Sequence, residues 1–362
     1  MRNLLLINIL LLCIVLYAGL TPFHAPRNQV TWSAGMNGLQ FGNHATIIAE
    51  RFLPPSGPGV DGHSLEIWIQ PDQPADSGTV LAFYDPKEPR GFGLHQSVND
   101  LELRVEPWLA WRPAKISTMF VDNAVRDGAA SLWAVSSGPS GTAIYRDGVK
   151  LQESRAFIVS GREFSGQLIL GTTPTSNDSW SGGLRGLAIY YRQLTAGQIA
   201  RHAQSWTRSG TPEISADEGC VALYLFDEHA GGVVHNKAAF GSDLRIPANY
   251  VLVNPTVLDP VWRAFNWSWG FWQDTLINIF GFVPVGFFLC AYFSARRAGW
   301  PALTASILGC GISLLIELAQ VFLPTRDSSM SDLLTNTAGS IIGAVLYRGK
   351  AAQAVERRIA GG

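Results

Sequence analysis

Residues Glu317–Gly343 read ELAQVFLPTRDSSMSDLLTNTAGSIIG, a stretch that sets charged and amide side chains inside otherwise apolar sequence. A charged side chain at mid-bilayer costs roughly 2.5–3.5 kcal/mol even on permissive insertion scales. Several such residues close together therefore indicate a shared polar site within a group of membrane helices. The stretch thus predicts both an α-helical membrane domain and the place where its function is to be sought.

Four apolar segments predict four transmembrane helices. They are Leu4–Leu20, Thr275–Phe293, Ala302–Leu323 and Leu333–Tyr347. At 1.5 Å per residue the third would extend about 33 Å and the fourth only about 22 Å, so the fourth is expected to begin near Ser331 and to cross a thinned region. A cleaved signal peptide is the alternative for the first segment, because small residues follow it.

Basic residues predict the orientation of these helices. Arg2 precedes the first segment, Arg296 and Arg297 lie between the second and third, and Arg348 follows the fourth. With four spans these groups share one side, which the positive-inside rule assigns to the cytoplasm. We therefore expect a multi-pass membrane protein with both termini cytoplasmic. The expected domains are a first helix (1–23), an extracytoplasmic domain (24–260), an aromatic interfacial segment (261–273), helices two to four (274–348) and a basic tail (349–362).

The overall composition fits a membrane protein that carries a large polar domain. Of the 362 residues, 47% are hydrophobic and only 15% are charged, against about one quarter charged in soluble proteins. The net charge of −1 gives no indication of a nucleic-acid partner. The four cysteines offer neither a disulfide framework nor a zinc-binding spacing. We identify no cofactor from these features.

The region between the first two apolar segments has the pattern of an all-β domain. Short alternating runs such as 64–70, 79–84, 131–135, 142–145, 166–171 and 186–191 are separated by Gly, Pro, Asn and Asp. This spacing predicts a β-sandwich. Asp147-Gly148 predicts a tight hairpin turn, because both positions of such a turn need positive φ angles. Residues 194–206 are the one segment with a helical pattern.

Several of these runs together resemble a concanavalin A-like, laminin-G-like jelly roll. The resemblance is carried by VTWSAGMNGLQF (30–41), AIYRDGVK (143–150), WSGGLRGLAIYYRQL (180–194) and VALYLFDE (221–228). It implies an all-β jelly-roll sandwich of a class that commonly binds glycans or proteins. The apolar segments on either side predict that this sandwich is inserted into a four-helix α-helical transmembrane domain.

The sandwich offers few candidate site residues. Calcium is commonly bound at the loop rim of this class, and Asn177 and Asp178 are the candidates here. Trp180 is a candidate for stacking on a sugar, with core packing as the alternative. Hydrolase activity is not expected, because glycosidases need paired carboxylates and Glu66 stands alone in its strand.

An aromatic segment joins the predicted sandwich to the second apolar segment. Trp262, Phe265, Trp269 and Trp272 recur at i, i+3, i+7 and i+10, which places them on one face if the stretch is helical. Tryptophan prefers the headgroup region of a bilayer, where its apolar ring and polar N–H are both accommodated. We therefore predict an interfacial helix; stacking of these rings on a carbohydrate is the alternative.

Polar residues recur at similar depth in three of the predicted helices. We call them the polar cluster: Asp274, Asn278, Glu317, Gln320, Arg326, Asp332 and Asn336. Each acid lies three or four residues from an amide, so each pair occupies one helix face. Arg326 is expected to form a bidentate pair with one of the carboxylates. The alternative is that these side chains cap helix ends, reach water, or bond between helices.

The same residues resemble the VanZ-like family of small membrane proteins. The matching positions are Thr21-Pro22-Phe23, DTLINIFGFVPVGF (274–287) and Glu317–Gly343. The resemblance implies a protein of the bacterial cytoplasmic membrane, associated with envelope glycans or glycolipids and with teicoplanin-type glycopeptide resistance. It implies no settled reaction, so enzymatic activity is left undecided and is not the favoured expectation.

Three functional hypotheses follow. The first is an accessory or receptor protein whose sandwich binds an envelope glycan or protein while the polar cluster binds a lipid headgroup or glycolipid. The second is an intramembrane enzyme for a lipid-linked envelope substrate, in which Glu317 or Asp332 is a base or metal ligand and Arg326 holds a phosphate or carboxylate. The third is a sandwich that the helices merely anchor in the lipid bilayer.

Overall fold

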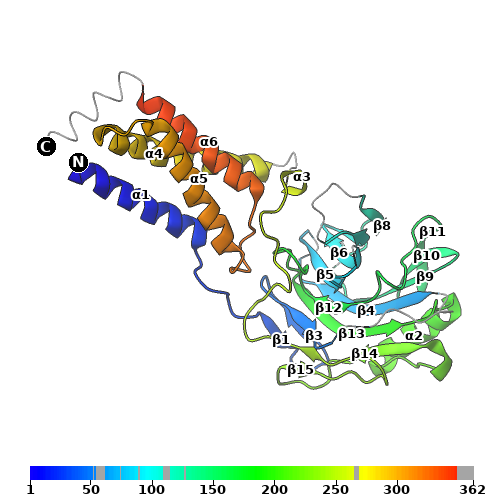
Figure 1. Cartoon of the computed structure of the whole chain (residues 1–362). Coiled ribbons are helices and arrows are strands. Elements are labelled where there is room, and N and C mark those ends of the chain that lie inside the picture. Colours follow the sequence, from blue (N-terminus) through cyan, green and yellow to red (C-terminus); the bar gives the residue numbers. More distant parts are fainter. Residues whose placement is uncertain are drawn as a thin grey trace. The chain divides into compact units, whose positions relative to one another are not determined.

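The protein consists of two compact units, which alternate along the chain. In the computed structural model the helical unit comprises residues 1–25 and 255–362, and the sandwich unit comprises residues 26–254. The structure describes residues 1–348 except 52, 54–61, 74, 89, 109–114, 126–127 and 265–268, and Figure 1 gives the labels of its elements. The basic tail 349–362 thus lies outside the described residues. The sandwich is inserted between the first helix and the remaining helices.

The sandwich unit consists of two antiparallel sheets, each with eight strands among the described residues, which confirms the predicted all-β architecture. The first sheet contains β1 (Val30–Trp32), β2 (Leu39–Phe41), β13 (Gly182–Tyr190), β4 (His63–Pro71), β9 (Ser131–Gly138), β10 (Gly141–Arg146) and β11 (Val149–Ser154), with β14 (Cys220–Tyr224) also paired to β13. The second contains β15 (Val233–Val234), β16 (Leu244–Arg245), β3 (Ile47–Ala49), β12 (Gln167–Leu170), β5 (Ser77–Tyr84), β6 (Gly91–Ser97), β7 (Asp100–Glu106) and β8 (Ser117–Val121).

Strand alternation decides which side chains fill the space between the sheets. In β4, Leu65, Ile67 and Ile69 point into the central core, whereas Glu66 and Trp68 lie on the opposite face. Successive side chains of a strand point to opposite faces, so a run of this kind supplies one core residue in two. The predicted hairpin joins β10 to β11, and Asp147 has the positive φ of 50° that its turn requires.

The outer face of the first sheet is covered by α2 (Ala196–Ser209). Thr195 and Gln198 form a capping box at its start, and Gly210 ends it in the left-handed conformation with a φ of 71°. Ile199, Ala203 and Trp206 form the buried face of the helix. The central strands are therefore buried on both faces, and the short 3-10 helix Ala216–Glu218 completes the cover.

The helical unit contains α1 (Arg2–Leu20), α3 (Val261–Ala264), α4 (Trp269–Ala295), α5 (Pro301–Gln320) and α6 (Met330–Tyr347). Within the described residues three helices, α1, α4 and α5, are long and apolar enough to cross a membrane. They expose large apolar side chains such as Leu6, Phe280 and Leu315, as expected of helices that face lipid.

The prediction of four transmembrane helices, the fourth a short one, is therefore wrong in its fourth member. The helix α6 forms, but it has only 18 residues, and its first half carries Asp332, Thr335 and Asn336. These polar side chains lower its mean hydropathy, and its length of about 27 Å is slightly short of the bilayer core.

Glycines let α6 pack closely against α4. A Cβ atom added to Gly343 would lie 2.0 Å from the carbonyl oxygen of Val283, and one added to Gly339 would lie 2.2 Å from that of Ile279. On the opposite helix, Gly286 faces the backbone of Ser340 in the same way. Small residues spaced four apart allow such backbone approach between membrane helices. The contact fixes the face of α6 that carries Asn336.

Candidate functional site

All seven residues of the polar cluster line one cavity of about 450 Å³ in the helical unit. They come from α4, α5, α6 and the loop between α5 and α6, and the end of α1 contributes Ala18 and Gly19 to the wall. The depth argument from the sequence thus brought together residues that the structure also brings together. Whether they bind a ligand stays a prediction.

Glu317 is the most deeply buried acid of the cluster, with 1% of its surface exposed. Its Oε2 atom accepts a hydrogen bond of 2.8 Å from the backbone N–H of Ser329, at the start of α6. The chain before α3 braces the same loop, because Asp259 exchanges backbone hydrogen bonds with Ser328 and Met330. The backbone of one loop therefore binds the carboxyl group, and the segment before α3 holds that loop in place.

Gln320 and Asn336 are buried amides whose nitrogen and oxygen atoms differ in their contacts. The side-chain nitrogen of Gln320 donates to the carbonyl oxygen of Gly19 at 2.9 Å, and that of Asn336 donates to Oγ of Ser313 at 3.0 Å. In the part of the chain that the structure describes, Gln320 Oε1 and Asn336 Oδ1 have no hydrogen-bond partner. Buried polar atoms are nearly always paired, so these two oxygens mark a place where a partner fits.

Arg326 does not form the predicted bidentate pair with a carboxylate. Its Nε atom donates to the carbonyl oxygen of Thr21 at 2.9 Å, and its Nη2 atom donates to the carbonyl oxygens of Ala18 and Thr21. Among the described residues no ion pair joins it to an acid. The last carbonyl groups of a helix lack intrahelical donors, and α1 ends at this point, so the guanidinium caps that helix.

The remaining members lie on facing parts of α4 and α6. Asn278 is within hydrogen-bonding reach of the Asp332 carboxyl group, and the acidic neighbours of Asp332 are Asp274 and Asp327. Asp274 is exposed, whereas Asp332 is half-buried. Asp327 and Thr325, which also line the cavity, were missed by the sequence analysis. Their position beside Arg326 was the available signal.

The predicted aromatic interfacial segment is described only in part. Trp262 lies in the four-residue helix α3, and Trp269 and Trp272 lie in the first turn of α4. All three are exposed. Phe265 lies outside the described residues, so a single helical face shared by the four rings stays a prediction.

Trp180 is buried and cannot stack on a glycan. Only 2% of its surface is exposed, its ring contacts Phe41, and its Nε1 atom donates to Oε1 of Gln96 at 2.8 Å. The alternative of core packing therefore holds. Trp180 lies in the segment between β12 and β13, two residues before β13 begins at Gly182.

The two calcium candidates have their side-chain oxygens engaged by the protein. Oδ2 of Asp178 accepts from the Thr79 hydroxyl at 2.6 Å, and Oδ1 of Asn177 accepts from the Tyr250 hydroxyl at 3.1 Å. Burial alone lowers the pKa of the neighbouring His95, but its contacts with Asp178 and Glu106 outweigh burial and raise that pKa. Calcium binding at this loop stays a prediction.

A buried ionic network that the sequence analysis did not foresee lies beneath α2. His202 Nδ1 is 2.8 Å from Oε1 of Glu66 and His202 Nε2 is 3.0 Å from Oε2 of Glu218. Burial alone lowers the pKa of His202, but both carboxylates together outweigh it and raise that pKa. Tyr190 and Trp206 also donate to Oε2 of Glu66, so this acid is fully used inside the fold.

Comparisons with known protein families match two parts of the chain, and the later of the two along the chain begins within the sandwich unit. Residues 220–352 match the VanZ/LLP1 family, and residues 45–200 match the concanavalin A-like lectin/glucanases superfamily. Both predicted resemblances are thereby confirmed, although Thr21–Phe23 and the run 30–41 fall outside the matched residues, and the run 221–228 lies within the VanZ/LLP1 match. A comparison with curated protein sequences gave no match.

Solved structures similar to this chain include binding domains of botulinum neurotoxins. The receptor-binding domain of botulinum neurotoxin D is 11% identical, with a TM-score of 0.38, and the match covers 57% of this chain and 60% of that one. The serotype D ligand-binding domain in complex with N-acetylneuraminic acid is 11% identical, with a TM-score of 0.37 and coverages of 61% and 62%. The chain thus spans less than two thirds of these neighbours.

Proposed function

We propose that this chain, which joins a VanZ/LLP1 family region to a concanavalin A-like domain, is an integral membrane accessory or receptor protein of the cell envelope. Its helical cavity binds the polar part of an envelope glycolipid or glycan. Its sandwich binds an envelope glycan or protein. The proposal includes a role in teicoplanin-type resistance, and only the resemblance to the VanZ family supports that part.

The observation that carries the proposal is the convergence of the polar cluster on one cavity. Seven polar residues from three helices and one connecting loop line the same space of about 450 Å³. This volume lies within the range of small-molecule sites, about 300–1,000 Å³. Polar side chains within membrane helices are costly, and capping or snorkelling would leave them scattered at separate helix ends. A shared ligand gives a common reason for their positions.

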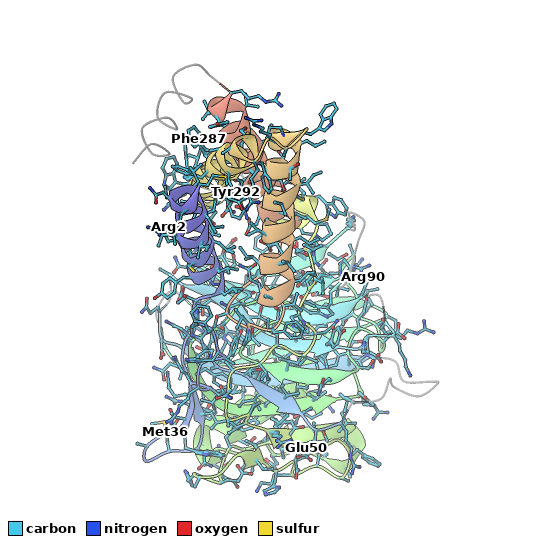
Figure 2. All side chains as sticks on the ribbon, turned by 60° about the vertical axis from the view of Figure 1, so that its left-hand side comes forward. Arg2, Met36, Glu50, Arg90, Phe287 and Tyr292 are labelled. Carbon is cyan, nitrogen blue, oxygen red and sulfur yellow. The ribbon has the colours of Figure 1, made fainter. Side chains whose placement is uncertain are left out.

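The distribution of arginines supports an orientation with the cavity on the outer side. Leu4 of α1 packs with Ala291 of α4 and Tyr347 of α6, so Arg2, Arg296 and Arg348 gather at one end of the helical unit. Figure 2 shows Arg2 in the same part of this unit as Phe287 and Tyr292. The positive-inside rule assigns this end to the cytoplasm. The opposite end, where α1 leads into the sandwich, then faces outward.

The two alternatives receive less support. For an intramembrane enzyme, Arg326 would have to hold a phosphate or carboxylate, yet two of its donor nitrogens already bind the carbonyl groups that end α1. A plain anchor gives no reason to bury the amide oxygens of Gln320 and Asn336 without a hydrogen-bond partner among the described residues. The receptor proposal accounts for both observations.

The proposal is tested on the full-length protein purified with its co-purifying lipids. Mass spectrometry of the retained lipids and glycans is compared between the parent and the Gln320→Leu/Asn336→Leu double variant. Leucine suits a membrane helix, so both proteins should insert and fold. We expect one class of lipid or glycan to be enriched in the parent and at least tenfold depleted in the variant.

A sandwich variant serves as the control. Asp217 is an exposed acid of the sandwich unit, and Asp217→Asn should keep the parental profile. Identical profiles in the parent and the double variant would refute the receptor proposal and favour an anchor. A Glu317→Gln variant that still binds the ligand but no longer converts it would favour the enzyme. The teicoplanin susceptibility of cells carrying the parent or the double variant tests the resistance link separately.

A further inference from the structure

The cavity in the helical unit has an excess of acidic groups. Its lining contains the carboxyl groups of Asp274, Glu317, Asp327 and Asp332, against one guanidinium, that of Arg326. The Nε and Nη2 atoms of that guanidinium donate to the carbonyl oxygens of Ala18 and Thr21. An anionic ligand would therefore meet four acids and a cation already engaged elsewhere.

The buried amides of the cavity also present acceptors rather than donors. Gln320 and Asn336 are 7% and 5% exposed, and their nitrogens are bound to Gly19 and Ser313. Their oxygens have no partner among the described residues. A buried acceptor without a partner is unfavourable, so a ligand gains most by bringing hydrogen-bond donors to these two oxygens.

The size of the cavity and the separation of its acidic side chains argue against a bare metal ion. In the described ranges no three His, Cys, Asp or Glu side chains come together closely enough to hold a metal. A volume of about 450 Å³ is also far larger than a single ion needs. A molecular cation fits better, because it fills space and carries its own donors.

Building on the proposed function of this cavity, we infer that the group it receives is an ammonium group. An ammonium group has three N–H donors and no acceptor, which matches a lining of carboxylate and amide oxygens. Its charge compensates the excess of acids around it. An ethanolamine lipid headgroup carries such a group, and so does an unacetylated amino sugar of a glycan or glycolipid.

The test compares pairs of probes that differ in the ammonium group. The full-length protein is placed in nanodiscs of phosphatidylcholine, whose quaternary nitrogen has no N–H donor, and titrated with glucosamine or N-acetylglucosamine. In a parallel arm the nanodiscs contain phosphatidylethanolamine, and lipid retained after exchange is measured. We expect glucosamine, phosphatidylethanolamine or both to bind, and N-acetylglucosamine to bind at least tenfold more weakly. The arm that responds identifies the source of the group.

Variants connect the binding to the cavity. Asp332→Asn removes one acid and should weaken binding of the responding probe at least tenfold, whereas Asp217→Asn on the sandwich removes the same charge and should have no effect. Asn336→Asp should strengthen binding, because it adds a carboxylate where the unpartnered oxygen lies and the Ser313 hydroxyl can turn to donate. A gain of this kind cannot come from misfolding.

The failure of this inference differs from the failure of the proposed function. If N-acetylglucosamine binds as tightly as glucosamine and Asp332→Asn has no effect, the ammonium inference is overturned while glycan binding by the cavity stands. If neither ammonium probe binds in either arm, the inference is overturned as well. Loss of the enriched lipid or glycan class in the earlier comparison would still uphold the receptor proposal.

Discussion

Replacing His202 by leucine should destabilise the sandwich strongly. His202 is fully buried and lies within 3.0 Å of a carboxylate oxygen on either side, so its removal leaves Glu66 and Glu218 facing each other at 0% and 1% exposure. Removing one partner of a buried ion pair costs about 3–5 kcal/mol. For a domain of this size, each kcal/mol lowers Tm by about 2–4 °C, which gives a decrease of roughly 6–20 °C.

The assay is thermal unfolding of the full-length protein, followed by circular dichroism. His235→Leu is the matched control, because His235 also lies 2.9 Å from a carboxylate, that of Asp243, but its side chain is 61% exposed. Exposed pairs contribute about 0–1 kcal/mol. Adding Glu66→Gln to His202→Leu should recover part of the loss, since one buried charge is removed. Equal Tm values for His202→Leu and His235→Leu would refute the reasoning.

Two further outcomes follow. The pKa of His202 is raised in the fold, so His202 contributes stability that is fully present below its ordinary pKa of 6.5 and is lost as pH rises through the folded pKa. Burial raises the pKa of Glu218, but Ser215 and His202 lower it more, so Glu218 contributes stability that is present above its ordinary pKa of 4.5 and is lost as pH falls through the folded pKa. In a pH series the Tm of the sandwich should therefore peak between pH 4.5 and 6.5, and in His202→Leu it should fall less on the alkaline side. Gly343→Ala should lower the Tm of the helical unit by overpacking worth about 1–3 kcal/mol, whereas Gly311→Ala, with nothing within 4 Å, should not.

The fold was predictable wherever an element presents a clear period. β4 and β13 alternate between the core and the face beneath α2, and their runs were recognised from the sequence. By contrast, β11 (Val149–Ser154) is exposed over nearly all its length, so no apolar alternation marks it. The prediction of a fourth span was wrong because it followed the apolar run of residues 333–347 and gave too little weight to the polar side chains at the start of α6.

The candidate site was predictable in its membership but not in its bonding. Counting depth along helices finds residues that share a level, and this was enough to gather Glu317, Gln320 and Asn336. The direction of each side chain depends on neighbours that have no sequence signal. The carbonyl of Gly19 and the hydroxyl of Ser313 orient the two amides, and neither can be read from the residues they orient.

Arg326 shows what this omission changes. From the sequence, an arginine beside several acids is most simply a partner for one of them, and a positive group in the pocket would select an anionic ligand. In the structure its donors bind the carbonyl groups that end α1, since these are the acceptors that the helix itself leaves unsatisfied. The arginine therefore ties the first helix to the loop that carries the pocket, and within the described part of the chain no ion pair joins it to the acids of the cavity. If α1 were cleaved as a signal peptide, the guanidinium would lose these acceptors and could turn to one of the acids, which would weaken the preference of the cavity for a cation. The proposed selectivity for a cation thus depends on the retention of the first helix.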